Sequence, residues 1–120
     1  MGDYRRLRAW QLARDLAVRS QPLIKKLPPE ERDALSDQWR RASYSVVLNI
    51  AEGASRRGPR EFRRYLDVAR ASLHEIATII DLVEGLEYLT ASELAPIRAL
   101  RDECARTVFG LLRSMTRPPP

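Results

Sequence analysis

The chain has 120 residues, with 21 Lys or Arg against 16 Asp or Glu and a net charge of +5, and this length predicts a single domain. One cysteine, Cys104, excludes an internal disulfide framework, and one histidine, His74, leaves too few ligands for a typical zinc site. We therefore expect no metal and no other cofactor. Only 5 glycines and an aromatic share of 7% argue against a turn-rich β sandwich, so the composition favours an all-α protein.

The first helix is predicted over residues 5–26, where apolar residues recur with the helical period. Its apolar stripe comprises Trp10, Ala13, Ala17, Ile24 and Leu27, with Leu12, Leu16 and Leu23 beside it. Pro22 has no backbone N–H to donate, so we expect a kink or a break near Ser20. Pro28 and Pro29 then end the segment.

The second helix is predicted over residues 29–55. Pro29 suits the first turn of a helix, and two glutamates follow it at the positive end of the helix dipole. The apolar stripe comprises Leu35, Trp39, Ala42, Val46, Ile50 and Gly53. Neighbouring positions are apolar as well, which predicts a helix that is buried centrally or covered by another subunit.

The third helix is predicted over residues 59–87, with Gly58 as a fair N-cap and Pro59 at the first helical position. Its apolar stripe comprises Phe62, Leu66, Ala69, Leu73, Ile76, Ile80 and Val83. The fourth helix is predicted over residues 91–115, because Thr90 and Glu93 have the spacing of a capping box. Its stripe comprises Leu94, Ile97, Cys104, Val108, Leu111 and Met115.

The connections between these helices are short, so each helix must run antiparallel to the one before it. The sequence therefore predicts an antiparallel up-down-up-down four-helix bundle over residues 1–117, followed by a Pro tail over residues 118–120. The first residues lack the apolar stretch of a signal peptide, and no apolar segment is long enough to cross a bilayer. We expect a cytoplasmic protein with no membrane partner.

Two segments of the chain resemble one bacterial protein family. The first runs from Gln38 to Gly53 and reads QWRRASYSVVLNIAEG, and the second runs from Glu61 to Glu75 and reads EFRRYLDVARASLHE. Both are similar to the signature blocks of the four-helix-bundle proteins encoded by intervening sequences in large-subunit ribosomal RNA genes. The chain departs from that pattern at Trp39, at Gly58 where the family usually has a capping Ser, and at Ala71 where Gly is common. These departures concern packing and capping.

The resemblance implies a four-helix bundle that assembles into a homopentameric ring. It also implies an affinity for nucleic acid and no established enzymatic activity. Related proteins are accessory factors beside reverse transcriptases in diversity-generating retroelements, so a reverse transcriptase or another nucleic-acid-handling protein is an expected class of partner.

The charges are unevenly distributed along the chain. Residues 56–70 hold six basic and two acidic groups, whereas residues 75–103 hold two basic and seven acidic groups. The predicted nucleic-acid-binding residues are Arg56, Arg57, Arg60, Arg63 and Arg64, which would form a basic cap at one end of the bundle. Free N–H groups at the start of the third helix would add to its attraction for phosphate. The alternative is a solvated arginine-rich face, paired in part with acidic residues of a neighbouring subunit.

Four further residues are predicted to be structural or to serve assembly: Arg41, Asn49, Glu52 and Gly53. Arg40 or Arg41 is expected to pair with Glu52 or Glu75 across helices. Asn49 and Glu52 lie three residues apart on one helix face and could share a partner. Ser45 and Ser72 are small enough to let helices approach closely, and we interpret them as packing residues.

An enzyme is the least favoured interpretation. His74 has no acidic residue three positions away, so the Glu-x-x-His units of carboxylate metal centres are absent, and Cys104 lies on an apolar stripe as expected for a buried thiol. The sequence predicts a non-enzymatic oligomer whose basic surface binds RNA or DNA without reading sequence. A protein–protein scaffold that binds no nucleic acid is the alternative.

Overall fold

The protein folds into four α-helices joined by connections over residues 25–34, 55–57 and 86–90, the first of which is longer than predicted. A computed structural model describes residues 3–116, and within that range it contains no strand. The helices are α1 (Arg8–Ile24), α2 (Leu35–Ala54), α3 (Gly58–Gly85) and α4 (Ala91–Thr116). Two 3₁₀ turns precede α1 and α2, at Tyr4–Arg6 and Pro29–Glu31. The expected all-α class is therefore confirmed.

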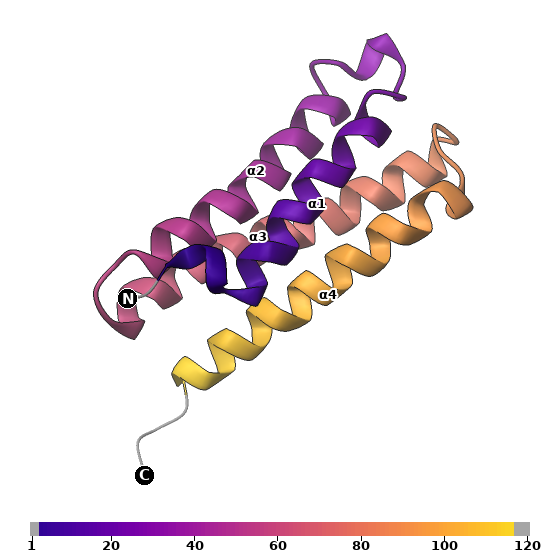
Figure 1. The fold of residues 1–120 in the computed structure, drawn as a ribbon. Helices are drawn as coiled ribbons and strands as arrows, with labels where there is room; N and C mark the ends of the chain where they lie inside the picture. The colour runs from indigo at the N-terminus through magenta and orange to yellow at the C-terminus, as the bar shows by residue number, and fades with distance from the viewer. Residues whose placement is uncertain (1–2, 117–120) are drawn as a thin grey trace.

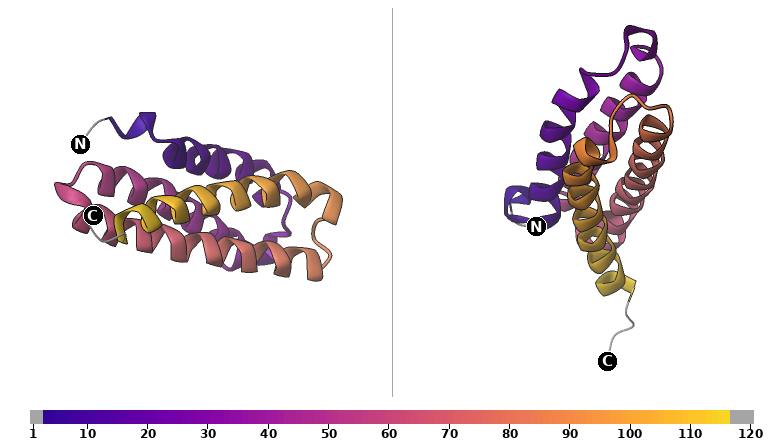
Figure 2. Two further views of the ribbon diagram at one scale, coloured as in Figure 1. Left: turned by 90° about the horizontal axis from the view of Figure 1, so that it is seen from below. Right: turned by 90° about the vertical axis from the view of Figure 1, so that its right-hand side faces the viewer.

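The helices form an elongated bundle. Each helix packs against its two neighbours in the order α1, α2, α3, α4 and back to α1, and the bundle measures 51 × 22 × 20 Å. Figures 1 and 2 show successive helices running up, down, up and down. The start of α1, the α2–α3 connection and the end of α4 therefore lie at one end of the bundle. The other two connections lie at the opposite end.

The first helix is shorter than expected and is not broken near Ser20. Leu7 is extended, so α1 begins at Arg8 and then continues through Pro22 to Ile24. Pro22 lies within the last turn, where it removes one backbone hydrogen bond and leaves the rest of the helix intact. Ser20 is fully buried, and its hydroxyl donates to the Leu16 carbonyl (2.7 Å) and accepts from the Trp39 indole (3.1 Å).

The prediction that the second helix begins at Pro29 is wrong. Pro29–Glu31 forms a single 3₁₀ turn, and α2 begins only at Leu35, after Ala34 leaves helical geometry. The fixed φ of proline suits a 3₁₀ turn as well as an α turn, so the sequence cue did not separate the two. The Glu31 side chain accepts the Leu35 backbone N–H at 3.3 Å, which compensates for the missing helical bond at this start.

The remaining boundaries agree closely with the predicted ones. The capping box is present before α4, since Thr90 and Glu93 each accept the other's backbone N–H at 3.0 Å. Gly58 is the first residue of α3 rather than its N-cap, which is Arg57. Gly58 has a φ of +81°, a left-handed conformation that favours glycine. The predicted Pro tail, residues 118–120, lies outside the described residues.

The predicted apolar stripes form the core. Every stripe residue predicted for the second and third helices is buried, and Trp39 is completely enclosed. In α4 the stripe is displaced at its end, because Leu112 is buried whereas Leu111 and Met115 are only partly covered. Trp10 is also only partly buried, with its ring stacked on Tyr4 at a centroid distance of 5.0 Å. None of the described helices is long and apolar enough to cross a membrane.

Candidate nucleic-acid interface

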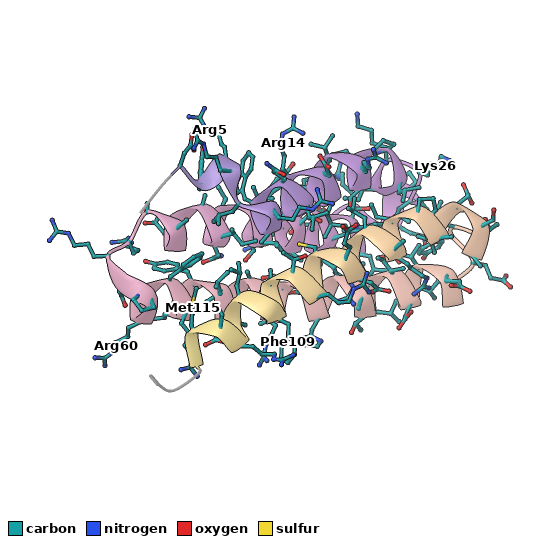
Figure 3. The ribbon with its side chains drawn as sticks, turned by 60° about the horizontal axis from the view of Figure 1, so that its bottom comes forward. Arg5, Arg14, Lys26, Arg60, Phe109 and Met115 are labelled. Atoms are coloured by element: carbon teal, nitrogen blue, oxygen red, sulfur yellow. The ribbon has the colours of Figure 1, made fainter. Side chains whose placement is uncertain are left out.

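The five arginines predicted to form a basic cap lie around the α2–α3 connection. Arg56 and Arg57 lie between the two helices, and Arg60, Arg63 and Arg64 lie in the first two turns of α3. All five are exposed. Figure 3 shows Arg60 at this end of the bundle, with Arg5 toward the same end and Lys26 toward the other. We call this set of five residues the basic end.

Two arginines of the basic end are held in place on one aromatic ring. The guanidinium carbons of Arg56 and Arg64 lie 5.3 Å and 4.6 Å from the ring centroid of Tyr65. Each also pairs with a carboxylate, Arg56 with Glu52 at 2.6 Å and Arg64 with Glu61 at 3.2 Å. The hydrogen bond from Arg64 lowers the pKa of the Glu61 carboxyl and raises the pKa of Arg64 itself. Ring contacts and ion pairs together orient these two side chains.

The other three arginines of the basic end keep their donors available. Within residues 3–116, no hydrogen bond, ion pair or ring contact involves the guanidinium of Arg57, Arg60 or Arg63. A guanidinium carries five N–H donors in a planar fork that matches phosphate oxygens. These three side chains can therefore bind an anion without first breaking an internal contact.

The start of α3 adds a positive partial charge at the same place. Its N-cap, Arg57, makes no side-chain capping bond, and Pro59 follows with no N–H of its own. The unpaired N–H groups of a first helical turn attract anions, and here they lie beside the free arginines. Glu61 is the one acidic residue of this turn, and Arg64 neutralises it.

The opposite end of the bundle carries four of the seven acidic residues of the segment 75–103, namely Asp81, Glu84, Glu87 and Glu93. Asp81 and Glu84 lie near the end of α3, where both pair with Arg98 of α4. Glu93 at the start of α4 pairs with Lys26 at 3.1 Å. The bundle is thus electrically polarised along its long axis, with a net positive charge around the α2–α3 connection.

Three of the four residues predicted to be structural or to serve assembly have local partners in place of the expected ones, namely Arg41, Asn49 and Glu52. Arg41 pairs with Asp37 one turn away at 3.6 Å, and Glu52 pairs with Arg56, so neither makes the expected contact across helices. Asn49 shares no partner with Glu52, because its side-chain amide donates to the carbonyl and the hydroxyl of Ser45. Local partners are reached at lower entropic cost, which explains the difference.

At Gly53, α2 and α3 approach each other closely. A Cβ atom added there would lie 2.8 Å from the Tyr65 Cβ and 2.9 Å from a Phe62 ring carbon. The glycine thus lets Tyr65, with its two stacked arginines, pack against the end of α2. Tyr65 was not among the predicted site residues, because contact between an aromatic ring and arginines of two segments leaves no periodic signal.

A small polar groove lies between α2 and α3, away from the basic end. The hydroxyl of Ser72 donates to that of Ser45 at 2.8 Å, so these two residues are hydrogen-bonded as well as closely packed. Gln38, Arg41, Ala42 and Glu75 complete the lining of the groove. Both segments that carry the family resemblance contribute to it, the first from α2 and the second from α3.

No group of three or more His, Cys, Asp or Glu within the described residues is arranged to hold a metal ion. His74 is exposed. The predicted burial of Cys104 is confirmed, and burial raises the pKa of its thiol to about 12. A thiol with that pKa is protonated at neutral pH and is a poor nucleophile.

Comparison with known proteins identifies the same family as the sequence motifs do. A family model described as "23S rRNA-intervening sequence protein" matches residues 5–110. A solved structure from Bacteroides thetaiotaomicron, described as a protein with unknown function from the S23 ribosomal protein family, is similar in fold with a TM-score of 0.80. The two sequences are 23% identical, and the similarity covers 88% of this chain and 98% of that one. None of the curated proteins compared with this chain matches it.

Proposed function

The chain belongs to the 23S rRNA-intervening sequence protein family, and from that premise we propose that it is a non-enzymatic oligomer whose basic end binds the phosphate backbone of RNA or DNA. One observation carries the proposal: Arg57, Arg60 and Arg63 are exposed, close in sequence and without a hydrogen bond or ion pair to the described residues. Arginine forks bind phosphate strongly, and phosphate contacts dominate sequence-independent affinity.

The binding is independent of base sequence. The described helices present no recognition motif to a groove, and Tyr65, the aromatic ring of the basic end, is contacted by two guanidiniums rather than left open for a base. Arg56 and Arg64 contribute positive charge in fixed positions, and the start of α3 contributes its N–H groups. Such a surface positions the phosphate backbone of a nucleic acid without contacting the edges of its bases.

The oligomer is a homopentameric ring, as the family resemblance implies. A ring repeats the basic end once per subunit, so several weak contacts act on one nucleic acid and the affinity rises by avidity. The protein acts in the cytoplasm beside a nucleic-acid-handling protein, with a reverse transcriptase as one class of partner. Cyclic symmetry repeats the basic end at the same level in every subunit of such a ring.

The test compares two double variants with the same net charge. Arg60→Glu/Arg63→Glu reverses two arginines of the basic end, and Arg19→Glu/Arg106→Glu reverses two exposed arginines elsewhere. Each variant falls from +5 to +1, because each reversal removes two charges. Fluorescence anisotropy with structured RNA and with duplex DNA measures binding at low and moderate salt. Only the first variant should bind the probes more weakly than the wild type, with an affinity reduced at least tenfold.

Equal losses in both variants would show that net charge alone attracts the nucleic acid and would refute a basic-end site. A wild-type protein that binds neither probe at low salt would refute nucleic-acid binding altogether. Circular dichroism and the oligomer mass should be unchanged in both variants, since all four side chains are exposed.

The second candidate function is a protein–protein scaffold that binds no nucleic acid. It is favoured by exposed apolar side chains on α1 and α2, namely Val18, Tyr44 and Leu48, because exposed apolar patches mark interfaces. The scaffold predicts that the charge reversals at Arg60 and Arg63 leave nucleic-acid binding absent as before and instead disrupt the oligomer or the capture of a protein client.

A further inference from the structure

A small pocket lies beside the α1–α2 connection, at the end of the bundle opposite the basic end (Figure 1). The end of α1, the connection and the first two turns of α2 line it, and its volume is about 270 Å³. Its polar lining comprises Lys25, Arg32, Ser36 and Arg40, and the rest of its lining is apolar. None of the described residues that line it is acidic. We call it the connection pocket.

The three cations of the connection pocket have donors to spare. Within the described part of the chain, the side chains of Lys25 and Arg40 make no hydrogen bond, ion pair or ring contact. Arg32 has one contact, an exposed pair with Asp33 at 3.7 Å, and a pair of that kind contributes little. Arg40 is half-buried, so its charge is partly removed from water without a carboxylate to compensate for it. An anion held in the pocket would supply the missing partner.

A buried hydroxyl lines the same pocket without a partner. Ser36 is only 5% exposed, yet its side chain makes no hydrogen bond with any residue between 3 and 116. Buried polar side chains are hydrogen-bonded in the large majority of cases, so this hydroxyl is an exception that a bound molecule would remove. Ser36 also belongs to the first turn of α2, where unpaired backbone N–H groups attract anions. The hydroxyl and the cations therefore favour the same kind of ligand.

Carboxylates at this end of the bundle are engaged elsewhere. Both carboxylate oxygens of Glu31 accept hydrogen bonds, one from the Leu35 backbone N–H and one from the Tyr88 hydroxyl. Three further carboxylates pair with cations outside the pocket, namely Asp81, Glu84 and Glu93. The cations of the connection pocket are thus left for an anion that the chain itself does not provide.

Charge, lining and size select the anion. A phosphate monoester carries a charge of about −1.5 to −2 at pH 7, which suits three cations better than a singly charged anion does, and guanidinium forks match its oxygens. The apolar part of the lining offers a surface to the organic group of the ester, namely Ile24, Leu27, Pro28 and Pro29. Glu30 and Asp33 are exposed on the same connection and repel further negative charge outside the pocket, which disfavours a nucleic-acid strand.

We propose that the connection pocket binds the phosphate group of a small organic phosphate monoester. The three cations and the Ser36 hydroxyl donate hydrogen bonds to the phosphate oxygens, and the apolar lining contacts the organic group. The site is independent of the function proposed above, because the connection pocket and the basic end lie at opposite ends of the bundle.

Three small anions test the choice of ligand by isothermal titration calorimetry at neutral pH and constant ionic strength. Phenyl phosphate has the dianionic group and an apolar ring, phenyl sulfate has the same shape with a single charge, and inorganic phosphate lacks the ring. The wild type should bind phenyl phosphate at least about tenfold more tightly than phenyl sulfate, because the second charge meets unpaired cations. It should bind inorganic phosphate more weakly than phenyl phosphate, because the apolar contact is lost.

Three variants test the residues of the pocket. Lys25→Gln, Arg40→Gln and Ser36→Ala should each lower the affinity for phenyl phosphate by about tenfold, because each removes a hydrogen bond to a charged group. Arg19→Gln is the matched control: Arg19 is exposed on α1 and lies outside the pocket, so this variant should keep the wild-type affinity. Lys25 is exposed, so Lys25→Gln tests the site even if Arg40→Gln or Ser36→Ala loses helical circular dichroism.

Arg60→Glu/Arg63→Glu separates this inference from the proposed function. It should lose nucleic-acid binding and keep the wild-type affinity for phenyl phosphate, since its two substitutions lie at the other end of the bundle. An equal loss of phenyl phosphate binding in this variant or in Arg19→Gln would show that net charge attracts the anion and would overturn the site.

Other results would overturn the inference as well. A wild type that binds no phenyl phosphate would refute it, as would equal affinities for phenyl phosphate and phenyl sulfate, or a folded Lys25→Gln variant with unchanged affinity. RNA with a 5′-phosphate carries the same group, and it should bind no more tightly than the same RNA with a 5′-hydroxyl. Tighter binding of the 5′-phosphate that Lys25→Gln abolishes would assign the pocket to RNA ends and refute the small ligand.

Discussion

Replacing Gly53 by alanine tests how closely α2 and α3 approach beside the basic end. The new Cβ atom would lie 2.8 Å from the Tyr65 Cβ and 2.9 Å from a ring carbon of Phe62, with the Phe62 carbonyl oxygen at 3.3 Å. Carbon atoms in optimal contact lie about 3.5–4.0 Å apart, so the substitution forces atoms to move. Phe62 is only 3% exposed and packs in the core, which leaves it little room to do so.

Two opposing effects set the size of the change. Replacing a helical glycine by alanine raises the free energy of unfolding by about 0.5–1 kcal/mol, because the unfolded chain then has less conformational entropy. Forcing an extra carbon into a packed interface costs about 1–3 kcal/mol. The difference centres on about 1 kcal/mol, so we expect Gly53→Ala to lower the free energy of unfolding by up to about 2.5 kcal/mol, which at roughly 4 °C per kcal/mol for a chain of this size lowers Tm by up to about 10 °C.

Urea unfolding followed by circular dichroism measures this change, with all proteins at one concentration because an oligomer's stability depends on it. Gly110→Ala is the matched control: Gly110 is also helical, but nothing lies within 4 Å of its added Cβ. The control should gain about 0.5–1 kcal/mol. Equal stabilisation of both variants would refute the close approach of α2 and α3 at Gly53.

Three further predictions concern the core and the two connections at the end of the bundle opposite the basic end, α1–α2 and α3–α4. Thr90→Ala removes one half of the capping box before α4 and should lower the free energy of unfolding by about 1 kcal/mol, as measured by urea unfolding. An unchanged free energy of unfolding would show that the Thr90 cap does not stabilise the protein. Tyr88 donates to the Glu31 carboxylate at 2.7 Å, which raises the pKa of Tyr88 to about 12. The stabilisation by this hydrogen bond should be present below pH 10 and lost as the pH rises toward 12. Tyr88→Phe should therefore remove the part of the pH dependence that Tyr88 contributes to the free energy of unfolding. Burial raises the pKa of Cys104 from 9.0 to about 12, so native protein at pH 9 should react with iodoacetamide far more slowly than urea-unfolded protein. The unfolded thiol ionises first, so the unfolding free energy should also fall between pH 9 and 12.

The core could be predicted from the sequence because burial imposes a strong period. The stripes of α2 and α3 are long and apolar, and every residue assigned to them is buried. At the end of α4 both Leu111 and Leu112 are apolar, so the period did not decide which of them is buried, and in the structure it is Leu112. The 3₁₀ turn at Pro29–Glu31 was missed for a similar reason, since proline is compatible with both helix types.

The ion pairs could not be predicted, because surface charges choose among several partners of nearly equal energy. Arg41 had an acidic residue one turn away, Asp37, and pairs with it instead of reaching Glu75 on α3. The placement of the five arginines at one end did follow from the sequence, since it depends only on the antiparallel order of the helices. Their contacts with Tyr65 depend on the crossing of α2 and α3, which no periodicity encodes.

The salt dependence of nucleic-acid binding tests the central claim most directly. Anisotropy titrations of a short DNA duplex at several salt concentrations would compare the wild type with Arg57→Gln/Arg60→Gln/Arg63→Gln, which removes the three arginines without described partners. A plot of log K against log salt concentration has a slope of about −0.9 for each phosphate contacted on duplex DNA. If the basic end binds the backbone, the triple variant should have a slope shallower by about 2–3 and a lower affinity at every salt concentration. Identical slopes for the two proteins would contradict the account.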